Sequence, residues 1–135
     1  MKRILLIQPS YPGSPFSITA WPVGLGYIAE SLRQAGVKYK VVDLRWHDYS
    51  FLEDKIKHFQ PELIGISLMS CNYKQHYELL IKIKSTFPKI SIIAGGPHVS
   101  FLREKVLEDC AAIDYGVVLE GEETIVELCL SLIHI

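Results

Sequence analysis

Short apolar runs alternate along the chain with longer amphipathic segments, which is the pattern of repeated strand–helix units. Five short, mostly apolar runs are predicted as strands: 3–8, 40–44, 63–69, 90–94 and 113–118. Segments with apolar residues every three or four positions are predicted as helices: 24–35, 51–59, 73–87, 100–109 and 122 onward. We expect Gly36 and Pro61 to end the first two helices and Ser100 to cap the fourth.

Uninterrupted apolar strands predict a parallel sheet with helices over both faces. The expected fold class is α/β, a flavodoxin-like doubly wound parallel five-stranded sheet with strand order 2-1-3-4-5. Ligands of such sheets bind beyond the carboxyl ends of the strands, near the point where the strand order reverses. The segments that follow the strands are therefore the candidate site: residues 8–24, 67–73, 94–98 and 118–123.

The first of these segments is unusually long for a strand–helix connection, which commonly takes about 2–6 residues. It carries Tyr11, Phe16 and Trp21, and we expect it to form an apolar wall or lid over the strand ends. The alternative is an ordered surface loop held by its prolines. Gly95 and Gly96 follow the fourth strand, and two adjacent glycines suggest that something passes close to the backbone, the alternative being a tight turn.

Composition narrows the possibilities for the whole chain. Its 135 residues suit one domain, and a net charge of −1 without a basic run disfavours nucleic-acid binding. No stretch approaches the length of a membrane-spanning helix, and the short apolar run near the N-terminus is not a signal peptide, so a cytoplasmic protein is expected. Cys71, Cys110 and Cys129 have no metal-binding spacing, so we expect free thiols and no metal bound by cysteine.

The loops argue against three common functions of this fold. A phospho-receiver domain needs acidic residues after the first strand and an aspartate after the third, but these strands end in Ile7-Gln8 and Ile66-Ser67. A flavodoxin needs a hydroxyl-rich phosphate loop, and the proline-rich first loop offers little to a phosphate. A dinucleotide site needs GxGxxG in a tight first turn, of which Gly24-Leu25-Gly26 is only a fragment.

Five segments in order, WPVGLGYIAESLRQAG, VVDL, PELIGISLMSCNY, IIAGGPHVS and DYGVVLEGEET, resemble the N-terminal cobalamin-binding domain of cobalamin-dependent radical SAM enzymes. The resemblance covers the chain up to about Leu128. In that family the nucleotide tail of cobalamin passes beside the sheet, between the first and last helices. The resemblance thus implies that the strand-4 glycines lie where the tail passes, and that the Ser67 hydroxyl bonds a ring nitrogen of the tail base.

The resemblance implies a set of residues that contact cobalamin. They are Ser67, Met69, Gly95, Gly96, Pro97, His98, Glu120, Gly121, Tyr11 and Trp21. Each has a plainer interpretation, such as capping by Ser67 or by the acidic turn around Gly121. Leu119 stands where the family often has glycine, so the shape of that last loop departs from the pattern.

The residues after the first strand, Gln8 to Gly13, lack the Asp-x-His-x-x-Gly motif whose histidine ligates cobalt in methionine-synthase-type domains. The resemblance therefore implies a base-off cofactor without a histidine ligand. His98 is expected to be a solvated loop residue near the corrin, and His47, His58 and His76 are expected at the surface. Cys71 is interpreted as small filler in a site loop.

Taken alone, the chain is interpreted as a binding module and not as an enzyme, since it lacks the CxxxCxxC motif of a radical SAM cluster. The family pattern implies a missing C-terminal radical SAM domain that carries an iron–sulfur cluster and S-adenosylmethionine. The parent enzyme would transfer methyl groups, although related members are cyclases. Two alternatives remain open: a degenerate interaction or sensory domain without cofactor, and a nucleotide or flavin binder of the same fold.

The last six residues, LSLIHI, are the in-frame translation of the end of a common transposase sequencing adapter. We therefore expect a cobalamin-binding domain over residues 1–129 and non-native sequence over residues 130–135. A natural apolar helix end is the alternative.

Overall fold

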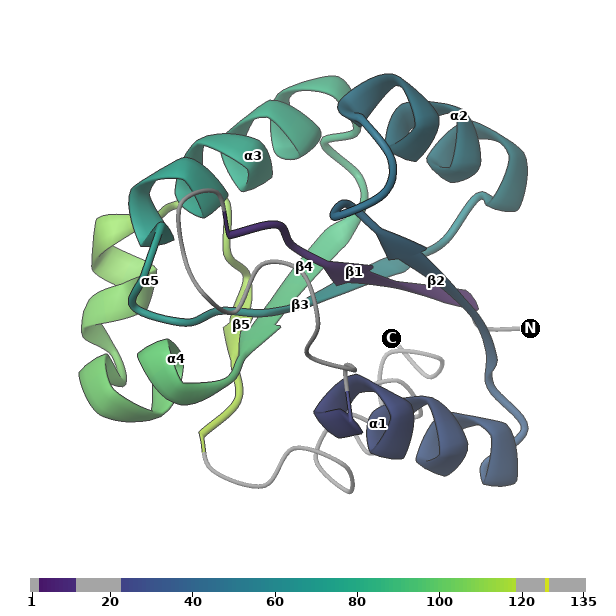
Figure 1. Cartoon of the computed structure of the whole chain (residues 1–135), viewed down its shortest axis with the longest axis horizontal. Coiled ribbons are helices and arrows are strands. Elements are labelled where there is room, and N and C mark those ends of the chain that lie inside the picture. Colours follow the sequence, from purple (N-terminus) through teal and green to yellow (C-terminus); the bar gives the residue numbers. More distant parts are fainter. Residues whose placement is uncertain (1–2, 12–22, 119–125, 127–135) are drawn as a thin grey trace.

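The protein is described by a computed structural model that covers residues 3–11, 23–118 and Val126, and it forms a parallel sheet flanked by helices (Figure 1). The strands are β1 (Arg3–Gln8), β2 (Lys38–Asp43), β3 (Leu63–Ser67), β4 (Ser91–Gly95) and β5 (Tyr115–Gly116). The helices are α1 (Val23–Gln34), α2 (Tyr49–Phe59), α3 (Tyr73–Thr86), α4 (Pro97–Leu102) and α5 (Lys105–Asp109). Strands and helices alternate up to β4, as the hydrophobic pattern predicts.

The five strands are all parallel and lie in the order β2-β1-β3-β4-β5, which confirms the predicted doubly wound fold. The order reverses between β1 and β3, where Ile4 pairs with Leu63. At the carboxyl end of the neighbouring pair, Ser67 of β3 lies beside Gly95 of β4. The candidate residues after β3 and β4 are therefore neighbours, because parallel strands end at the same edge.

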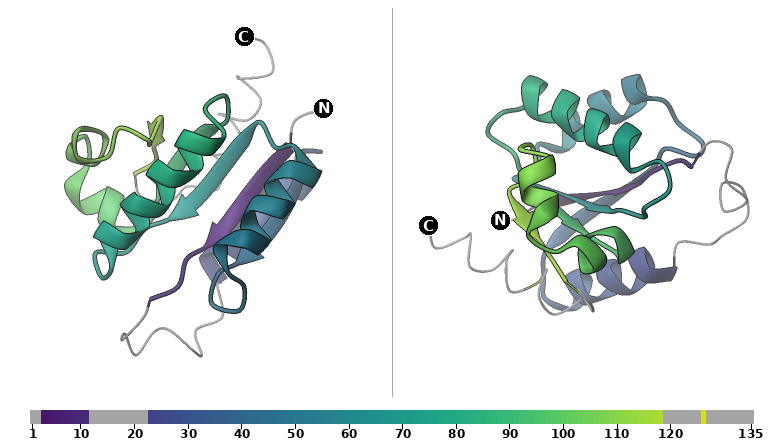
Figure 2. Two further views of the ribbon diagram at one scale, coloured as in Figure 1. Left: turned by 90° about the horizontal axis from the view of Figure 1, so that it is seen from above. Right: turned by 90° about the vertical axis from the view of Figure 1, so that its left-hand side faces the viewer.

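Two hydrophobic cores lie on opposite faces of the sheet. Figures 1 and 2 show α2 and α3 over one face and α1 over the other. Alternate residues of each strand point to opposite faces, so Leu5 and Ile7 of β1 join the α2/α3 core, whereas Ile4 and Leu6 join the α1 core. Val126 also packs against the α1 core.

Local interactions explain the turn after α1 and the start of α2. After α1 the chain turns at Gly36, whose φ of 77° is in the left-handed region that glycine adopts without strain. The Asp48 side chain accepts a hydrogen bond of 2.9 Å from the Phe51 amide and so caps the N-terminus of α2. These turns bring β2 and β3 back to the sheet on either side of β1.

The structure differs from the sequence-based expectation around the fourth helix. The predicted single helix over 100–109 is two short helices, α4 and α5, which are separated at Arg103 with φ 52°. Proline at the first position starts α4 at Pro97, so Ser100 lies inside this helix and does not cap it. The predicted fifth helix lies outside the described residues, apart from the helical Val126.

Among residues 3–11, 23–118 and 126, none of the helices combines the length and the apolar character needed to cross a lipid bilayer.

Candidate functional site

The face of the sheet beneath α1 carries little side-chain volume near the carboxyl ends of β3 and β4. Gly65 and Ser67 occupy alternate positions of β3, and Gly95 is the last residue of β4. Because positions two apart in a strand share a face, Gly65 and Ser67 lie on the side that α1 covers, as Leu63 does. Two glycines and one serine therefore leave a trough between the sheet and the helix.

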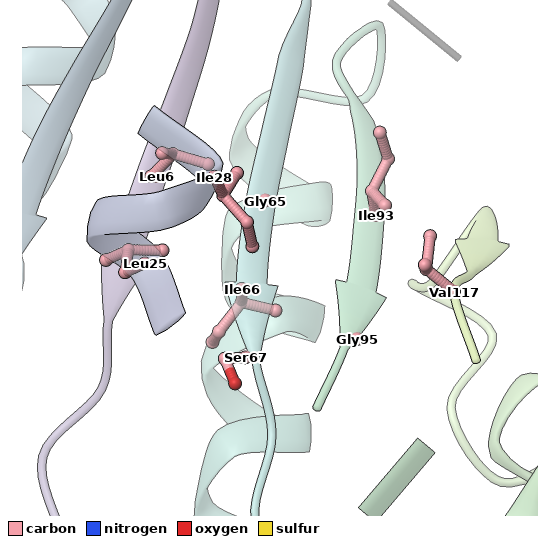
Figure 3. A pocket seen from close by; sticks show the side chains of 9 residues that line it. All are labelled: Leu6, Leu25, Ile28, Gly65, Ile66, Ser67, Ile93, Gly95 and Val117. Atoms are coloured by element: carbon pink, nitrogen blue, oxygen red, sulfur yellow. The ribbon is translucent and has the colours of Figure 1, made fainter. Parts of the chain in front are cut away.

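Apolar side chains form the walls of this trough, which has a free volume of about 40 Å³ (Figure 3). Its lining residues are Leu6, Leu25, Ile28, Gly65, Ile66, Ser67, Ile93, Gly95 and Val117. Leu25 and Ile28 come from α1, and the others come from the strands or from the end of β5 (Figure 3). The Ser67 hydroxyl is the polar side-chain group of this lining, so the trough suits a flat apolar group with one hydrogen-bonding atom.

The two adjacent glycines have different structural roles. A Cβ atom at Gly95 would make ordinary contacts, 3.6 Å from the Val117 carbonyl oxygen and 3.8 Å from its Cβ. A Cβ atom at Gly96 would lie 2.6 Å from Ser67 Oγ and 2.8 Å from the Leu68 carbonyl oxygen, and the backbone there has φ 93°. Gly96 is thus required by the chain's own turn, whereas Gly95 keeps the trough open.

His98 is buried in α4 at 2% exposure, which corrects the expectation of a solvated loop histidine. Its Nε2 lies 2.7 Å from the Tyr77 hydroxyl and its Nδ1 lies 3.1 Å from Ser70 Oγ. The Tyr73 ring stacks on the imidazole at a centroid distance of 4.9 Å. Both ring nitrogens therefore have protein partners, and the ring fastens the segment after Gly96 to α3.

Burial affects the acid–base properties of this cluster. Desolvation lowers the pKa of His98 and raises the pKa of Tyr77 to about 12. Both groups are consequently neutral near pH 7. A neutral tyrosine and a neutral imidazole can share one hydrogen bond without burying a charge.

Tyr11 and His76 form a second buried contact next to β1. His76 is 4% exposed, so the expectation that it lies at the surface is wrong. Its Nε2 lies 2.8 Å from the Ser10 carbonyl oxygen, and its ring meets Tyr11 edge-on at 5.2 Å. Desolvation, with a smaller contribution from Cys71, raises the pKa of Tyr11 to about 12. Tyr11 therefore packs against α3. The rest of the predicted wall or lid, with Phe16 and Trp21, lies outside the described residues.

The other residues that were predicted to contact cobalamin lie in different parts of the chain. Met69 and Cys71 are half-buried in the connection between β3 and α3, while Pro97 is exposed at the start of α4. Trp21, Glu120 and Gly121 lie outside the described residues. The structure thus brings Ser67 and Gly95 together at the trough, with Gly96 directly behind Ser67.

Sequence reasoning missed Gly65 and the apolar wall formed by Leu6 and Ile28. A signal for Gly65 was present, since a glycine inside an apolar strand marks a close approach of another group. The wall residues carry no such signal, because an isoleucine or leucine in an amphipathic segment is normally assigned to the core.

Within the part of the chain that the structure describes, no group of three or more His, Cys, Asp or Glu side chains is arranged to hold a metal ion. The site is thus characterised by its shape and by the Ser67 hydroxyl.

Comparison with known proteins identifies the family of this chain. The B12 binding domain family matches residues 18–129. An uncharacterized methyltransferase of Pyrococcus horikoshii is 30% identical over 132 residues, which cover 95% of this chain and 28% of the relative. The anaerobic magnesium-protoporphyrin IX monomethyl ester cyclase of Cereibacter sphaeroides is 28% identical over 131 residues, covering 93% of this chain and 21% of the cyclase.

A solved structure shows the same fold. The cobalamin-dependent S-adenosylmethionine radical enzyme OxsB, with aqua-cobalamin and S-adenosylmethionine bound, superposes with a TM-score of 0.82 at 21% identity. The match covers 99% of this chain and 19% of OxsB, so the chain spans a small part of the length of the proteins it resembles. With its family pattern matched over most of its length, the chain belongs to the B12 binding domain family and is related to the N-terminal part of cobalamin-dependent radical SAM enzymes.

Proposed function

We propose that this domain holds cobalamin with its nucleotide tail detached from cobalt and without a histidine ligand, in the service of a radical SAM domain. The observation that carries the proposal is the trough beneath α1, where Gly65, Ser67 and Gly95 leave space along the sheet. A Cβ on Gly95 would enter this region without a clash, so the fold itself does not require glycine there. A ligand that passes along the strand end gives the glycine a purpose.

The trough suits the tail base in chemistry and must widen to admit it. Its walls are apolar and the Ser67 hydroxyl can donate a hydrogen bond to a ring nitrogen. Its volume of about 40 Å³ is well below the roughly 150 Å³ of a protein cavity that accommodates benzene. Tail binding therefore requires α1 to move away from the sheet, and α1 contributes Leu25 and Ile28 to the wall.

Two observations support the proposal that no histidine of this chain ligates cobalt. The last residue of β1 and those that follow it, from Gln8 to Tyr11, contain no histidine. His98 already engages both of its ring nitrogens, with Tyr77 and Ser70. Ligation through Nε2 would break the buried contact with Tyr77, which costs about 1–3 kcal/mol for the partner left unsatisfied. Ligation through Nδ1 would break the partly buried contact with Ser70.

Cobalamin, when bound, supplies a methyl group on cobalt for transfer. The domain's part is to orient the cofactor by its tail and to exclude water from the trough. The similarity to a methyltransferase and a cyclase supports a parent enzyme of cobalamin-dependent radical SAM type, with methyl transfer as the proposed reaction. Its iron–sulfur cluster and S-adenosylmethionine would be held by a further domain.

Spectrophotometric titration with cobalamin and with cobinamide, the same corrin without the nucleotide tail, tests the proposal. We expect saturable binding of cobalamin with a base-off spectrum, and at least about tenfold weaker binding of cobinamide because the tail contacts are lost. Gly95→Val should weaken cobalamin binding, since the added methyls occupy the trough. Gly26→Val is the matched control, because a Cβ at Gly26 meets nothing within 4 Å.

Circular dichroism must show that each variant is folded. Failure of the folded wild-type domain to bind cobalamin would contradict the proposal and favour the alternative of an interaction or sensory domain without cofactor. Equal affinity for cobalamin and cobinamide would contradict the tail-bound mode. Residues 1–129 should bind as residues 1–135 do if the last six residues lie outside the domain.

A further inference from the structure

Three polar side chains form a continuous series of contacts at the carboxyl edge of the sheet. The Tyr77 hydroxyl of α3 lies 2.7 Å from Nε2 of His98, and Nδ1 of the same ring lies 3.1 Å from Ser70 Oγ. Tyr77 and His98 are buried, whereas Ser70 is exposed in the connection between β3 and α3. A buried polar pair is thus connected to the protein surface through one hydroxyl group.

The burial of Tyr77 determines the direction of these hydrogen bonds. A buried hydroxyl hydrogen needs an acceptor, and the imidazole nitrogen Nε2 of His98 lies 2.7 Å from the phenol oxygen. Burial raises the pKa of Tyr77 to about 12 and lowers the pKa of His98, so the phenol keeps its hydrogen and the imidazole is neutral. Nε2 therefore accepts, and because a neutral imidazole carries one N–H, Nδ1 donates to Ser70 Oγ.

Ser70 is the last group of the series and has a hydrogen to donate. Its oxygen accepts from the imidazole, so its own hydrogen is directed to a partner outside these three side chains. Each hydrogen bond in such a series polarises the next, which makes the last hydroxyl a better donor than an isolated serine. The Tyr73 ring stacks on His98 at a centroid distance of 4.9 Å and an interplanar angle of 21°, and this contact holds the imidazole plane in place.

Ser70 is also close to the trough along the chain. It comes three residues after Ser67, and three residues span at most about 11 Å. The intervening Leu68 is held by two backbone hydrogen bonds, because its amide donates to the Gly95 carbonyl oxygen at 2.8 Å and its carbonyl oxygen accepts from the His98 amide at 3.0 Å. A ligand as large as cobalamin that contacts Ser67 can therefore also contact Ser70.

We propose that the Ser70 hydroxyl donates a hydrogen bond to an oxygen acceptor of bound cobalamin, and that His98 is the positioning residue that orients this donor. The inference rests on the proposed function, because cobalamin supplies the acceptor. Two kinds of oxygen on cobalamin qualify, namely a phosphate oxygen of the nucleotide tail and an amide carbonyl oxygen of the corrin rim. Both accept hydrogen bonds, which matches a hydroxyl whose oxygen has already accepted from the imidazole.

The tautomer of His98 tests the direction of the contacts in the domain without cofactor. In a domain with ¹⁵N-labelled histidine, long-range proton–nitrogen correlation spectra distinguish the two neutral tautomers. We expect the ring hydrogen of His98 on Nδ1, whereas His76, whose Nε2 lies 2.8 Å from the Ser10 carbonyl oxygen, should carry it on Nε2. A hydrogen on Nε2 of His98 would overturn the proposal, because Ser70 would then donate to the ring and have no hydrogen left for cobalamin.

Ser70→Ala tests the contact with cobalamin. This variant should bind cobalamin about three- to tenfold more weakly than the wild type, the contribution of one hydrogen bond. The matched control is Ser85→Ala, which removes an exposed hydroxyl near the C-terminal end of α3 and should leave the affinity unchanged. In titrations with cobinamide, an equal loss in Ser70→Ala would assign the acceptor to the corrin rim, and no loss would assign it to the nucleotide tail.

Two substitutions of His98 separate positioning from stability. The terminal amide of asparagine comes close to the position of Nδ1, and that of glutamine comes close to the position of Nε2. His98→Asn should keep a donor for Ser70 and bind cobalamin within about twofold of the wild type, although it loses the buried contact with Tyr77. His98→Gln should keep a partner for Tyr77 and bind as weakly as Ser70→Ala.

Urea denaturation of the two His98 variants is the accompanying control. His98→Asn should be no more stable than His98→Gln, because it gives up the more deeply buried contact, so tighter binding by His98→Asn cannot come from stability. Affinities that follow stability would overturn the positioning role. Unchanged cobalamin affinity in Ser70→Ala would overturn the contact while leaving cobalamin binding by the domain intact, whereas a folded wild-type domain that does not bind cobalamin would refute the proposed function and this contact together.

Discussion

Gly95 and Gly96 are adjacent in sequence but differ in what a side chain would meet. At Gly96 a Cβ would lie 2.6 Å from Ser67 Oγ, and the positive φ of 93° strains any other residue. At Gly95 the nearest atom would be 3.6 Å away. Gly96 is therefore needed for the turn, whereas Gly95 leaves space at the end of the strand. The two adjacent glycines in the sequence do not by themselves show this difference.

Gly96→Ala should lower the free energy of unfolding by at least about 2 kcal/mol, because backbone strain and a steric clash add. Gly95→Ala should change it by less than about 1 kcal/mol. Urea denaturation of the two variants beside the wild type measures this difference. Equal destabilisation of both would show that the turn does not depend on Gly96.

His76 and His98 should make the domain less stable in mild acid. Burial lowers both pKa values below the ordinary value of histidine, so the unfolded chain takes up protons first as the pH falls below about 6.5. The free energy of unfolding should be level above that pH and decrease below it, by at most about 1.4 kcal/mol per pH unit for each histidine.

Urea midpoints measured between about pH 5 and pH 8 provide the test. His76→Gln should reduce the acid slope, because one of the two buried rings is removed. His58→Gln, at an exposed position, should retain the slope. A wild-type domain whose stability does not change over this range would show that the two rings are not held neutral.

At the scale of the elements, one carboxylate connects the C-terminal part of α3 to two strands. Asp114, just before β5, accepts hydrogen bonds of 2.8 Å from Lys84 Nζ and from the Ile92 amide. Lys84 Nζ also donates to the Ile90 carbonyl oxygen at 2.8 Å. Since β5 contains only Tyr115 and Gly116, this side chain helps to hold a short edge strand in register.

Asp114→Ala should cost about 1–3 kcal/mol of stability, because the Ile92 amide and Lys84 lose their shared acceptor. The control is Asp109→Ala, which removes an exposed pair with Lys105 within α5 and should cost less than about 0.5 kcal/mol. Thermal unfolding followed by circular dichroism compares the two. If the costs are alike, the Asp114 contacts do not contribute beyond an ordinary surface ion pair.

At the scale of the whole molecule, the described residues form hydrophobic clusters of different size on the two faces of the sheet. The α2/α3 face buries the larger hydrophobic cluster, with Leu52, Leu80 and Ile83 inaccessible to solvent. The α1 face has a smaller cluster interrupted by the trough. Because α1 contributes Leu25 and Ile28 to the wall of the trough, we propose α1 as the element that moves when a ligand enters.

Hydrogen exchange should therefore report tail binding through α1. Cobalamin should change the exchange rates of amides in α1 while those of α2 stay the same, because the trough must widen from about 40 Å³. Cobinamide, which lacks the tail, should leave α1 unchanged. Identical effects of the two corrinoids would show that the trough is not the tail site.

The structure confirms the predicted strand order. This order could be predicted because apolar strands separated by amphipathic helices can be recognised in the sequence alone. The positions of Ser67 and Gly95 at the carboxyl edge follow from the same order. The split between α4 and α5 was missed, because it depends on the conformation of Arg103, a residue type with no preference for positive φ.

The burial of His76 and His98 could not be predicted, because it depends on which residues of α3 face Ser10, Tyr11 and α4. The sequence by itself thus determined the fold class, the edge of the sheet where the candidate site lies and the candidate pair of glycines. Only the tertiary structure decided which glycine leaves space and which histidines are buried. The physical reason is that periodicity specifies the face of each element, whereas contacts between residues distant in sequence arise only when the elements pack.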